Sequence, residues 1–140
     1  MAFAGINYLA VVIAAAASFL FGALWYGVLG KRWMAALGKT EADIKGKDGK
    51  GSILPFVIAI VSQLVMAYVL AGVMGHLGAG GFTIRGGLIS GVFIWLGFVL
   101  TTLATNHGFQ GAKPSLTLID GGHWLAVLLI QGAIIGAFGV

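Results

Sequence analysis

The chain has 140 residues, of which 59% are hydrophobic and only 9% are charged, with a net charge of +4. A water-soluble domain carries about a quarter charged residues, so this composition excludes an ordinary soluble fold. No cysteine is present, which excludes a disulfide, a thiolate metal site and a cysteine nucleophile.

Four apolar runs, at residues 3–30, 53–77, 86–107 and 118–139, cover most of the chain. Each is near or above the length of about 20 residues that a helix needs to cross the hydrocarbon layer. Membrane β-strands are about ten residues of alternating polarity, a pattern that these runs lack. The sequence therefore predicts an all-α polytopic membrane protein, a single domain over 1–140 built as a bundle of four transmembrane helices.

The first run is expected to be a retained helix and not a cleaved secretory signal. No Lys or Arg precedes it, and it is too long for the apolar core of a signal peptide. Trp25 and Tyr26 mark one boundary of this span and Tyr8 marks the other, as aromatic residues do at membrane surfaces.

The segment 31–52 is a solvated loop that carries most of the positive charge. It contains Lys31, Arg32, Lys39, Lys45, Lys47 and Lys50; Lys113 follows the third run, and Arg85 alone lies on the opposite side. Short loops rich in Lys and Arg stay in the cytoplasm, so both termini are expected outside. Contact with membrane lipids is expected, and no nucleic-acid partner is, because no exposed domain could present a basic patch.

Small residues spaced by four mark a contact face on every span. These residues are Ala14, Ser18 and Gly22; Ala67, Ala71 and Gly75; Gly87 and Gly91; Gly132 and Gly136. Helices in lipid associate through such faces because small side chains let backbones approach. Together with the 24 glycines of the chain, they also lead us to expect a homo-oligomer, with a tight monomeric bundle as the alternative.

The third and fourth runs carry polar residues at membrane depth. Helical periodicity places Ser90, Gly97, Thr101 and Thr105 on one face, and Asp120, His123, Val127 and Gln131 on another; Gln63 is at mid-depth in the second run. If these faces converge, they line a groove that is open to the cytoplasm. The alternative is that the hydroxyls bond to carbonyls of their own helix and that Gln63 or Gln131 bonds to a neighbouring helix. Trp95, also at mid-depth, needs a partner for its N–H.

Asn106, His107, Asp120 and His123 gather where the third run ends and the fourth begins. Three interpretations remain open. Asp120 and His123 with His107 could handle a proton or ion. The same three residues resemble a His/His/carboxylate metal site. Finally, Gly108 could end one helix, with His107 at its negative terminus, while Asp120 caps the next.

No enzyme signature is present: the sequence has no HExxH pair, no GxSxG elbow and no phosphate loop in the required context. We therefore expect a protein that is not an enzyme and needs no cofactor.

Two regions resemble an uncharacterised family of small bacterial four-helix integral membrane proteins, a domain of unknown function. The first is "NYLAVVIAAAASFLFGALWYG" (7–27) with "GKRWM" (30–34), and the second is "TNHGF" (105–109) followed by "LIDGGHWL" (118–125). The resemblance implies four helices and a bacterial inner membrane, and it implies no activity. The positions that it highlights are Asn7, Tyr8, Trp25, Tyr26, Asn106, Asp120, His123 and Trp124.

The functional hypothesis is that the protein binds or conducts a small solute, ion or proton through a polar groove between helices two to four. Asp120 and His123 would titrate, with His107 and Asn106 at the mouth, and Thr101, Thr105, Gln63 and Gln131 would line the groove. The alternative is a non-catalytic structural or accessory subunit of a larger membrane complex.

Overall fold

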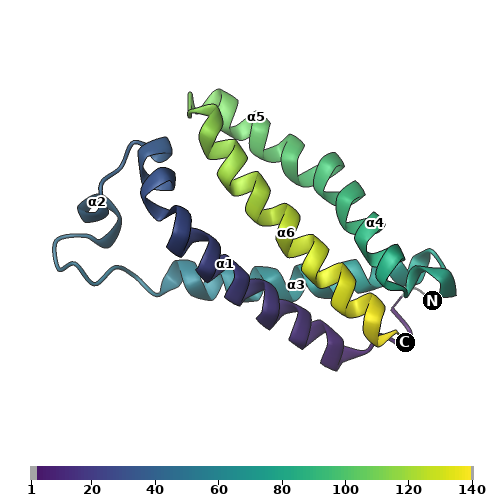
Figure 1. Ribbon diagram of the computed structural model, residues 1–140. Coiled ribbons are helices and arrows are strands. Elements are labelled where there is room, and N and C mark those ends of the chain that lie inside the picture. The colour runs from purple at the N-terminus through teal and green to yellow at the C-terminus, as the bar shows by residue number, and fades with distance from the viewer. Residues whose placement is uncertain (1–2, 140) are drawn as a thin grey trace.

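The structure, a computed structural model, describes residues 3–139, and it is helical throughout its regular elements (Figure 1). The elements are α1 (Tyr8–Leu37), α2 (Glu41–Lys45), α3 (Leu54–His76), η1 (Ala79–Gly81), α4 (Ile84–Ile94), η2 (Trp95–Leu100), α5 (Thr101–Phe109) and α6 (Pro114–Phe138). Because α4, η2 and α5 form one continuous helix, the described residues contain four helices long and apolar enough to cross a membrane. The predicted multi-pass, all-α architecture is confirmed.

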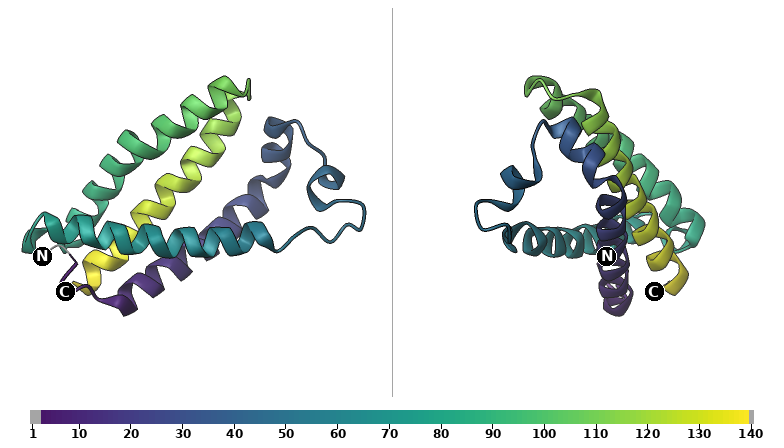
Figure 2. Two further views of the ribbon diagram at one scale, coloured as in Figure 1. Left: turned by 180° about the vertical axis from the view of Figure 1, so that it is seen from behind. Right: turned by 60° about the vertical axis from the view of Figure 1, so that its left-hand side comes forward.

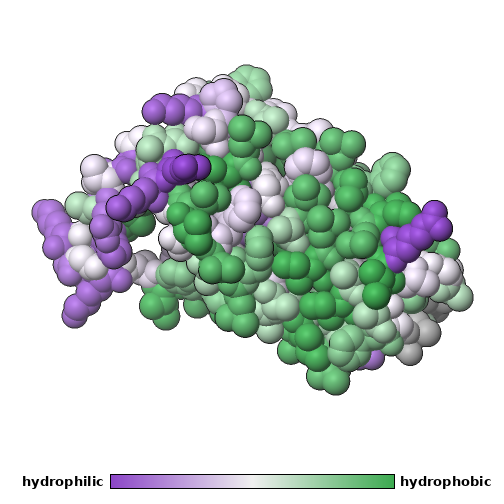
Figure 3. Space-filling model, in the orientation of Figure 1, coloured by the Kyte–Doolittle hydropathy of each residue, from purple (hydrophilic) through white to green (hydrophobic). Residues whose placement is uncertain are grey.

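Helix α6 is central to the bundle, because it packs against both α1 and α4 while α3 crosses α1 (Figures 1 and 2). The two chain ends and η1 lie at one end of the bundle, here called the termini end. The segment containing α2 and the turn between α5 and α6 lie at the other, here called the loop end. Hydrophobic residues cover the helices in Figure 3, and most hydrophilic residues on that face gather at the loop end.

Helix α1 begins later and ends later than the predicted 3–30. Asn7 caps its start, since the Ala10 N–H donates to Asn7 Oδ1 at 3.1 Å. The segment 31–37 contains no helix breaker, so the helix continues beyond the apolar run to Gly38, whose φ of 74° ends it. The loop therefore begins at residue 38 and not at residue 31.

The short helix α2 organises part of the loop. Thr40 and Asp43 form a reciprocal capping box at its start. The Lys45 ammonium, 2.5 Å from Glu41, holds the pKa of that carboxyl below its usual range. Hydrogen bonds from the Thr40 N–H and hydroxyl likewise lower the pKa of Asp43. Both carboxylates therefore stay ionised at neutral pH and offset part of the positive charge of the loop.

The last two spans are longer than predicted at the loop end. The third continues to Phe109, and α6 begins at Pro114 instead of residue 118. Proline suits the first turn of a helix because its missing N–H would be unpaired there anyway. Gly111, at φ 67°, makes the turn between the two helices.

Glycines bring the backbones of α4 and α6 into direct contact. A Cβ at Gly87 would lie 1.9 Å from the Gly132 carbonyl oxygen, and a Cβ at Gly132 would lie 2.3 Å from the Gly87 carbonyl oxygen. At Gly136 a Cβ would lie 2.1 Å from the Thr83 carbonyl oxygen. No side chain fits at these distances, so the contact face predicted from glycine spacing is confirmed for these two helices.

The predicted faces of the first two spans are also buried. Ala14 and Ser18 of α1 have no exposed surface, and neither does Ala67 of α3. Ala71 is 1% exposed, whereas Gly75, at the edge of this face, is only half-buried.

A π-helical segment, η2, interrupts the third span at Trp95–Leu100. Bonding from residue i to i+5 places more residues in each turn than the α-helix does, so the segment shifts the angular phase of everything after it. Before η2 the buried residues are Gly87, Ser90 and Gly91; after it, within α5, the buried residue is His107. The face that begins at Ser90 therefore does not continue to Thr101.

The contact between Gly87 and Gly132 predicts that one added methyl group at this position lowers the free energy of unfolding. Gly132→Ala should destabilise the protein by about 1–3 kcal/mol, because the new Cβ overlaps the Gly87 backbone and the two helices must separate. Thermal unfolding in detergent micelles, followed by circular dichroism, measures this effect.

Gly108→Ala is the matched control, since Gly108 is exposed in a helix and a Cβ there meets no atom within 4 Å. It should be neutral or slightly stabilising. Equal unfolding temperatures for the two variants would contradict the proposed role of the contact.

Candidate functional site

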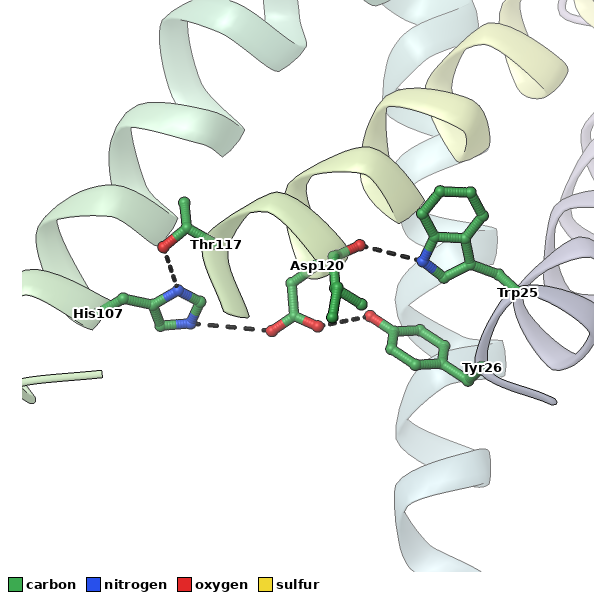
Figure 4. Close-up of polar contacts among 6 residues, drawn as sticks. Trp25, Tyr26, His107, Thr117 and Asp120 are labelled. Carbon is green, nitrogen blue, oxygen red and sulfur yellow. Dashed lines mark hydrogen bonds and ion pairs between the residues drawn. The ribbon is translucent and has the colours of Figure 1, made fainter. Parts of the chain in front are cut away.

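Polar side chains on the buried side of α6 gather in two places. One is the loop-end cluster, which consists of Tyr26, His107, Thr117 and Asp120 (Figure 4). The other is the mid-bundle node, which consists of Ser18, Gln63 and Gln131. Asp120 and Gln131 are eleven residues apart on α6, so the two groups lie roughly 16 Å apart along the helix axis.

Asp120 is the centre of the loop-end cluster. The Tyr26 hydroxyl donates to Asp120 Oδ1 at 2.7 Å, and His107 Nε2 lies 3.8 Å from Asp120 Oδ2. The other ring nitrogen of His107, Nδ1, lies 2.8 Å from the Thr117 hydroxyl oxygen. Figure 4 shows these four side chains in a row that joins α5, α6 and α1.

The structure excludes part of the helix-ending interpretation. Asp120 lies six residues after Pro114, inside α6, so its carboxylate cannot cap the start of that helix. Gly108 is helical, and the left-handed residue of the turn is Gly111 instead. His107 does lie in the last turn of α5, where the negative helix terminus favours a cation. The position of Asp120 therefore still needs another explanation.

Asp120 also differs in location from the other acidic residues of the chain. The other three acidic residues, Glu41, Asp43 and Asp48, belong to the loop segment, so Asp120 is the one carboxylate of the membrane-spanning helices. Its side chain is 19% exposed and that of His107 is 11% exposed. A partly accessible carboxylate at membrane depth is costly unless it has partners, which makes it a functional candidate.

Two tryptophans join the "LIDGGHWL" segment to its neighbours. Trp25 Nε1 donates to the Ile119 carbonyl oxygen at 3.0 Å, and Trp95 Nε1 donates to the Gly121 carbonyl oxygen at 2.8 Å. The Trp25 ring lies against Gly122, where a Cβ would approach Cζ2 to 3.1 Å. Gly122 therefore makes room for an indole. The N–H of Trp95 has the partner that it was expected to need.

His123 does not pair with Asp120, contrary to the sequence prediction. Its ring packs over Gly22, where a Cβ would lie 2.8 Å from His123 Nε2, and against Tyr26 and Trp124. It is 4% exposed, and its Nδ1 has no hydrogen-bond partner among the described residues. Spacing by three places both side chains on one side of α6, but the Tyr26 hydroxyl takes up one carboxylate oxygen and Gly22 leaves space for the imidazole.

The mid-bundle node is buried, and hydrogen bonds join its three side chains. Ser18 Oγ donates to Gln63 Oε1 at 2.8 Å, and Gln131 Nε2 donates to Ser18 Oγ at 3.1 Å and to the Gln63 carbonyl oxygen at 3.2 Å. Ser18 and Gln131 have no exposed surface and Gln63 is 2% exposed. The structure therefore shows the alternative to the groove, in which these glutamines bond to a neighbouring helix, and Ser18 of α1 is their third partner.

Thr101, Thr105 and Asn106 lie apart from the mid-bundle node, on an exposed face of α5. Both threonine hydroxyls donate to carbonyls of their own helix, those of Gly97 and Thr101. With Thr102 these three residues line a shallow open hollow of about 270 Å³. The predicted common groove with Gln63 and Gln131 is not formed, because η2 rotates this face away from the interior.

The described residues contain no group of three His, Cys, Asp or Glu side chains that could hold a metal ion. His107 and Asp120 face each other, but His123 is directed toward Gly22 and not toward them. The predicted His107, Asp120 and His123 metal set is therefore not assembled.

Sequence reasoning missed the contact of Tyr26 with Asp120, because it placed Tyr26 at the membrane boundary and only highlighted it through the family resemblance. The signal was available: "WY" and "LIDGGHWL" both belong to the stretches that carry the family resemblance, and the structure places them in contact. Because Trp25 bonds the Ile119 carbonyl oxygen, the next residue of α1, Tyr26, lies beside the next residue of α6, Asp120. Proximity of the motifs, and not either motif alone, identifies the pair.

The mid-bundle node predicts energetic coupling across helices. In a double-mutant cycle, Ser18→Ala and Gln131→Met should show an interaction energy of about 0.6–1.7 kcal/mol, the range for hydrogen bonds between membrane helices. Unfolding by sodium dodecyl sulfate in mixed micelles gives the free energies. The control pair, Thr101→Ala with Gln131→Met, should be additive because Thr101 bonds only its own helix. Coupling of equal size in both pairs would contradict the network.

The chain was compared with protein families, curated proteins and solved structures. A family model described as "Protein of unknown function (DUF1761)" matches residues 9–136. No curated protein and no solved structure matches the chain. The matched range includes every residue of the loop-end cluster and of the mid-bundle node, and it confirms the resemblance to an uncharacterised family. The chain is a member of the DUF1761 family, whose function is unknown.

Proposed function

We propose that the protein takes up and releases a proton or another small cation at Asp120, and passes it along the buried side of α6. The observation that carries the proposal is the contact set of this one carboxylate: Tyr26 at 2.7 Å on one oxygen and His107 at 3.8 Å from the other. Imidazole and carboxyl groups are the usual proton carriers in membrane proteins. Both side chains are partly accessible, so they can exchange with water at the loop end.

Polar atoms deeper in the bundle supply further positions for such transfer. His123 Nδ1, Gln131 Oε1 and Ser90 Oγ are buried and lack hydrogen-bond partners among the described residues. His123 and Gln131 follow Asp120 along α6, at successively greater depth. Ser90 lies between Gly87 and Gly91, whose contacts on α6 are Gly132 and Leu128, so it matches the depth of Gln131. Buried polar atoms with free bonding capacity are where a water or an ion gains most from binding.

The proposed orientation follows from charge. With Lys31, Arg32 and the lysines of the loop on one side, the loop end lies in the cytoplasm and both termini lie outside, as in a bacterial inner membrane. Asp120 then exchanges protons with the cytoplasm.

We further propose that copies of the chain associate in the membrane, because α5 and the first half of α3 have large exposed faces.

Flux through liposomes tests the proposal directly. The purified protein is reconstituted with a pH-sensitive dye inside, and a potassium gradient with valinomycin drives protons inward. Asp120→Asn should abolish the protein-dependent proton flux, because the amide cannot ionise. Tyr26→Phe keeps the ring but removes the donor to Asp120, and should change the rate without abolishing flux.

Asp48→Asn is the matched control, since Asp48 is a carboxylate of the exposed loop. It should retain the native rate. Equal flux in native protein and Asp120→Asn, with both variants folded by circular dichroism, would rule out the titrating role of Asp120.

The accessory-subunit alternative has one observation in its favour. The first two turns of α3, from Leu54 to Val61, expose large apolar side chains on nearly every side, including Phe56 at 62% and Ile58 at 56%. In the accessory role, this half-helix would pack against another membrane protein. Native mass spectrometry after extraction in lipid nanodiscs separates the cases: a fixed stoichiometric complex with a different polypeptide supports the accessory role, and assemblies of this chain alone contradict it.

A further inference from the structure

We infer that the loop-end cluster is a binding site for a primary ammonium group, with Asp120 as its counter-charge. The inference rests on the proposed function, in that it takes Asp120 as an accessible, ion-handling carboxylate, and it adds the chemical class of the ligand. It is carried by the acceptors, the aromatic rings and the depth of the cluster.

Three acceptor atoms from three helices lie along this row, with His107 Nε2 and the Tyr26 oxygen on opposite sides of the Asp120 carboxylate (Figure 4). Asp120 Oδ2 has no hydrogen-bond partner among the described residues and faces His107 Nε2 at 3.8 Å, which is too long for a direct bond. If the Nδ1 proton of His107 is donated to Thr117, then Nε2 is an acceptor. The Tyr26 oxygen, which donates to Oδ1, keeps its lone pairs for a further donor. A primary ammonium has three N–H donors, and two of them can bridge the 3.8 Å gap between Asp120 Oδ2 and His107 Nε2.

Aromatic rings stand beside these acceptors. The Tyr26 ring contacts Trp33 edge to face, with centroids 5.8 Å apart, and contacts His123 with centroids 5.0 Å apart. Trp25 is held next to them by its bond to the Ile119 carbonyl oxygen. A carboxylate combined with tyrosine and tryptophan faces is the usual environment of an organic cation, since the ring faces are negative.

The cluster lies at a depth that an ammonium group can reach. Asp120 is six residues into α6, or roughly 9 Å from its start along the axis. The first half of α3 points away from the loop end of α6, as Figures 1 and 2 show, so α1, α5 and α6 form this end of the bundle. Two sources of the same chemistry can arrive here: a free amine from solution, and the headgroup of phosphatidylethanolamine.

A matched ligand series tests the recognition chemistry. Native protein in phosphatidylcholine nanodiscs is titrated with benzylamine, benzyl alcohol and benzyltrimethylammonium, and tryptophan fluorescence reports binding. Benzylamine should bind about tenfold or more tightly than either analogue, because the alcohol lacks the charge and the quaternary ion lacks the three donors. Equal affinity for all three would overturn the inference.

Substitutions in the loop-end cluster test whether benzylamine binds there. Asp120→Asn should weaken benzylamine binding on the order of tenfold or more, because the counter-charge is lost. Tyr26→Phe, the mildest change to the cluster, should weaken it by about threefold, because the hydroxyl that holds Asp120 Oδ1 in place is lost. Asp48→Asn should bind as the native protein does. Native affinity in both cluster variants would place any binding elsewhere and overturn the inference.

The two sources are separated by lipid composition. In nanodiscs of phosphatidylethanolamine and phosphatidylglycerol, native mass spectrometry detects lipid retained on the protein. Retention of phosphatidylethanolamine by native protein, its loss in Asp120→Asn and its displacement by benzylamine identify the headgroup as the ligand. Benzylamine binding without such retention identifies a free amine. If benzylamine does not bind and no phosphatidylethanolamine is retained, the inference is overturned.

These outcomes are independent of the proton-flux result. If Asp120→Asn abolishes flux but benzylamine does not bind, the proposed function stands and the ligand class is wrong. If benzylamine binds through Asp120 while flux is unaffected, the site is an ammonium receptor and the proposed transfer along α6 is wrong.

Discussion

Close approach between helices is the constraint on which this structure depends. In lipid, apolar helices gain little from hiding apolar surface, so the bundle needs backbone contact and interhelical hydrogen bonds. The contact of Gly87 with Gly132 fixes α4 against one side of α6, and the Trp25 bond to Ile119 fixes α1 against the other. With α6 held from two sides, its polar side chains have defined partners. The position of Asp120 is therefore a product of the packing and not of local helix chemistry.

The fold was predictable because span number depends only on run length and composition. The contact faces of α4 and α6 were also predictable, since Gly87 and Gly91, and Gly132 and Gly136, are spaced by four, but the pairing of these two faces was not. The ends of the helices were less predictable from the sequence. The end of α1 was placed at the first basic residue, yet charge does not end a helix, and Gly38 in the left-handed conformation does. Charge marks the membrane boundary, whereas glycine marks the helix boundary.

The candidate site was predictable in part. His107 and Asp120 were expected to be neighbours because a short turn makes their helices antiparallel, and the structure places them 3.8 Å apart. The partner of Asp120 on α1 was not predictable, since the register between α1 and α6 depends on Gly22 and Gly122 accepting rings. Periodicity alone also misassigned Thr101 and Thr105. It assumes an unbroken α-helix, and nothing in the composition of residues 95–100 announces a π-helical turn.

That turn divides the third span into two parts with different surroundings. On its termini side the helix offers glycine to a protein neighbour; on its loop side it offers hydroxyls outward and a single imidazole inward. In an uninterrupted α-helix, the inward and outward faces of the loop-side part would be exchanged. His107 would then face the bilayer, and Asp120 would have no imidazole opposite it. The irregular hydrogen bonding of six residues thus decides which chemistry the bundle encloses and which it displays.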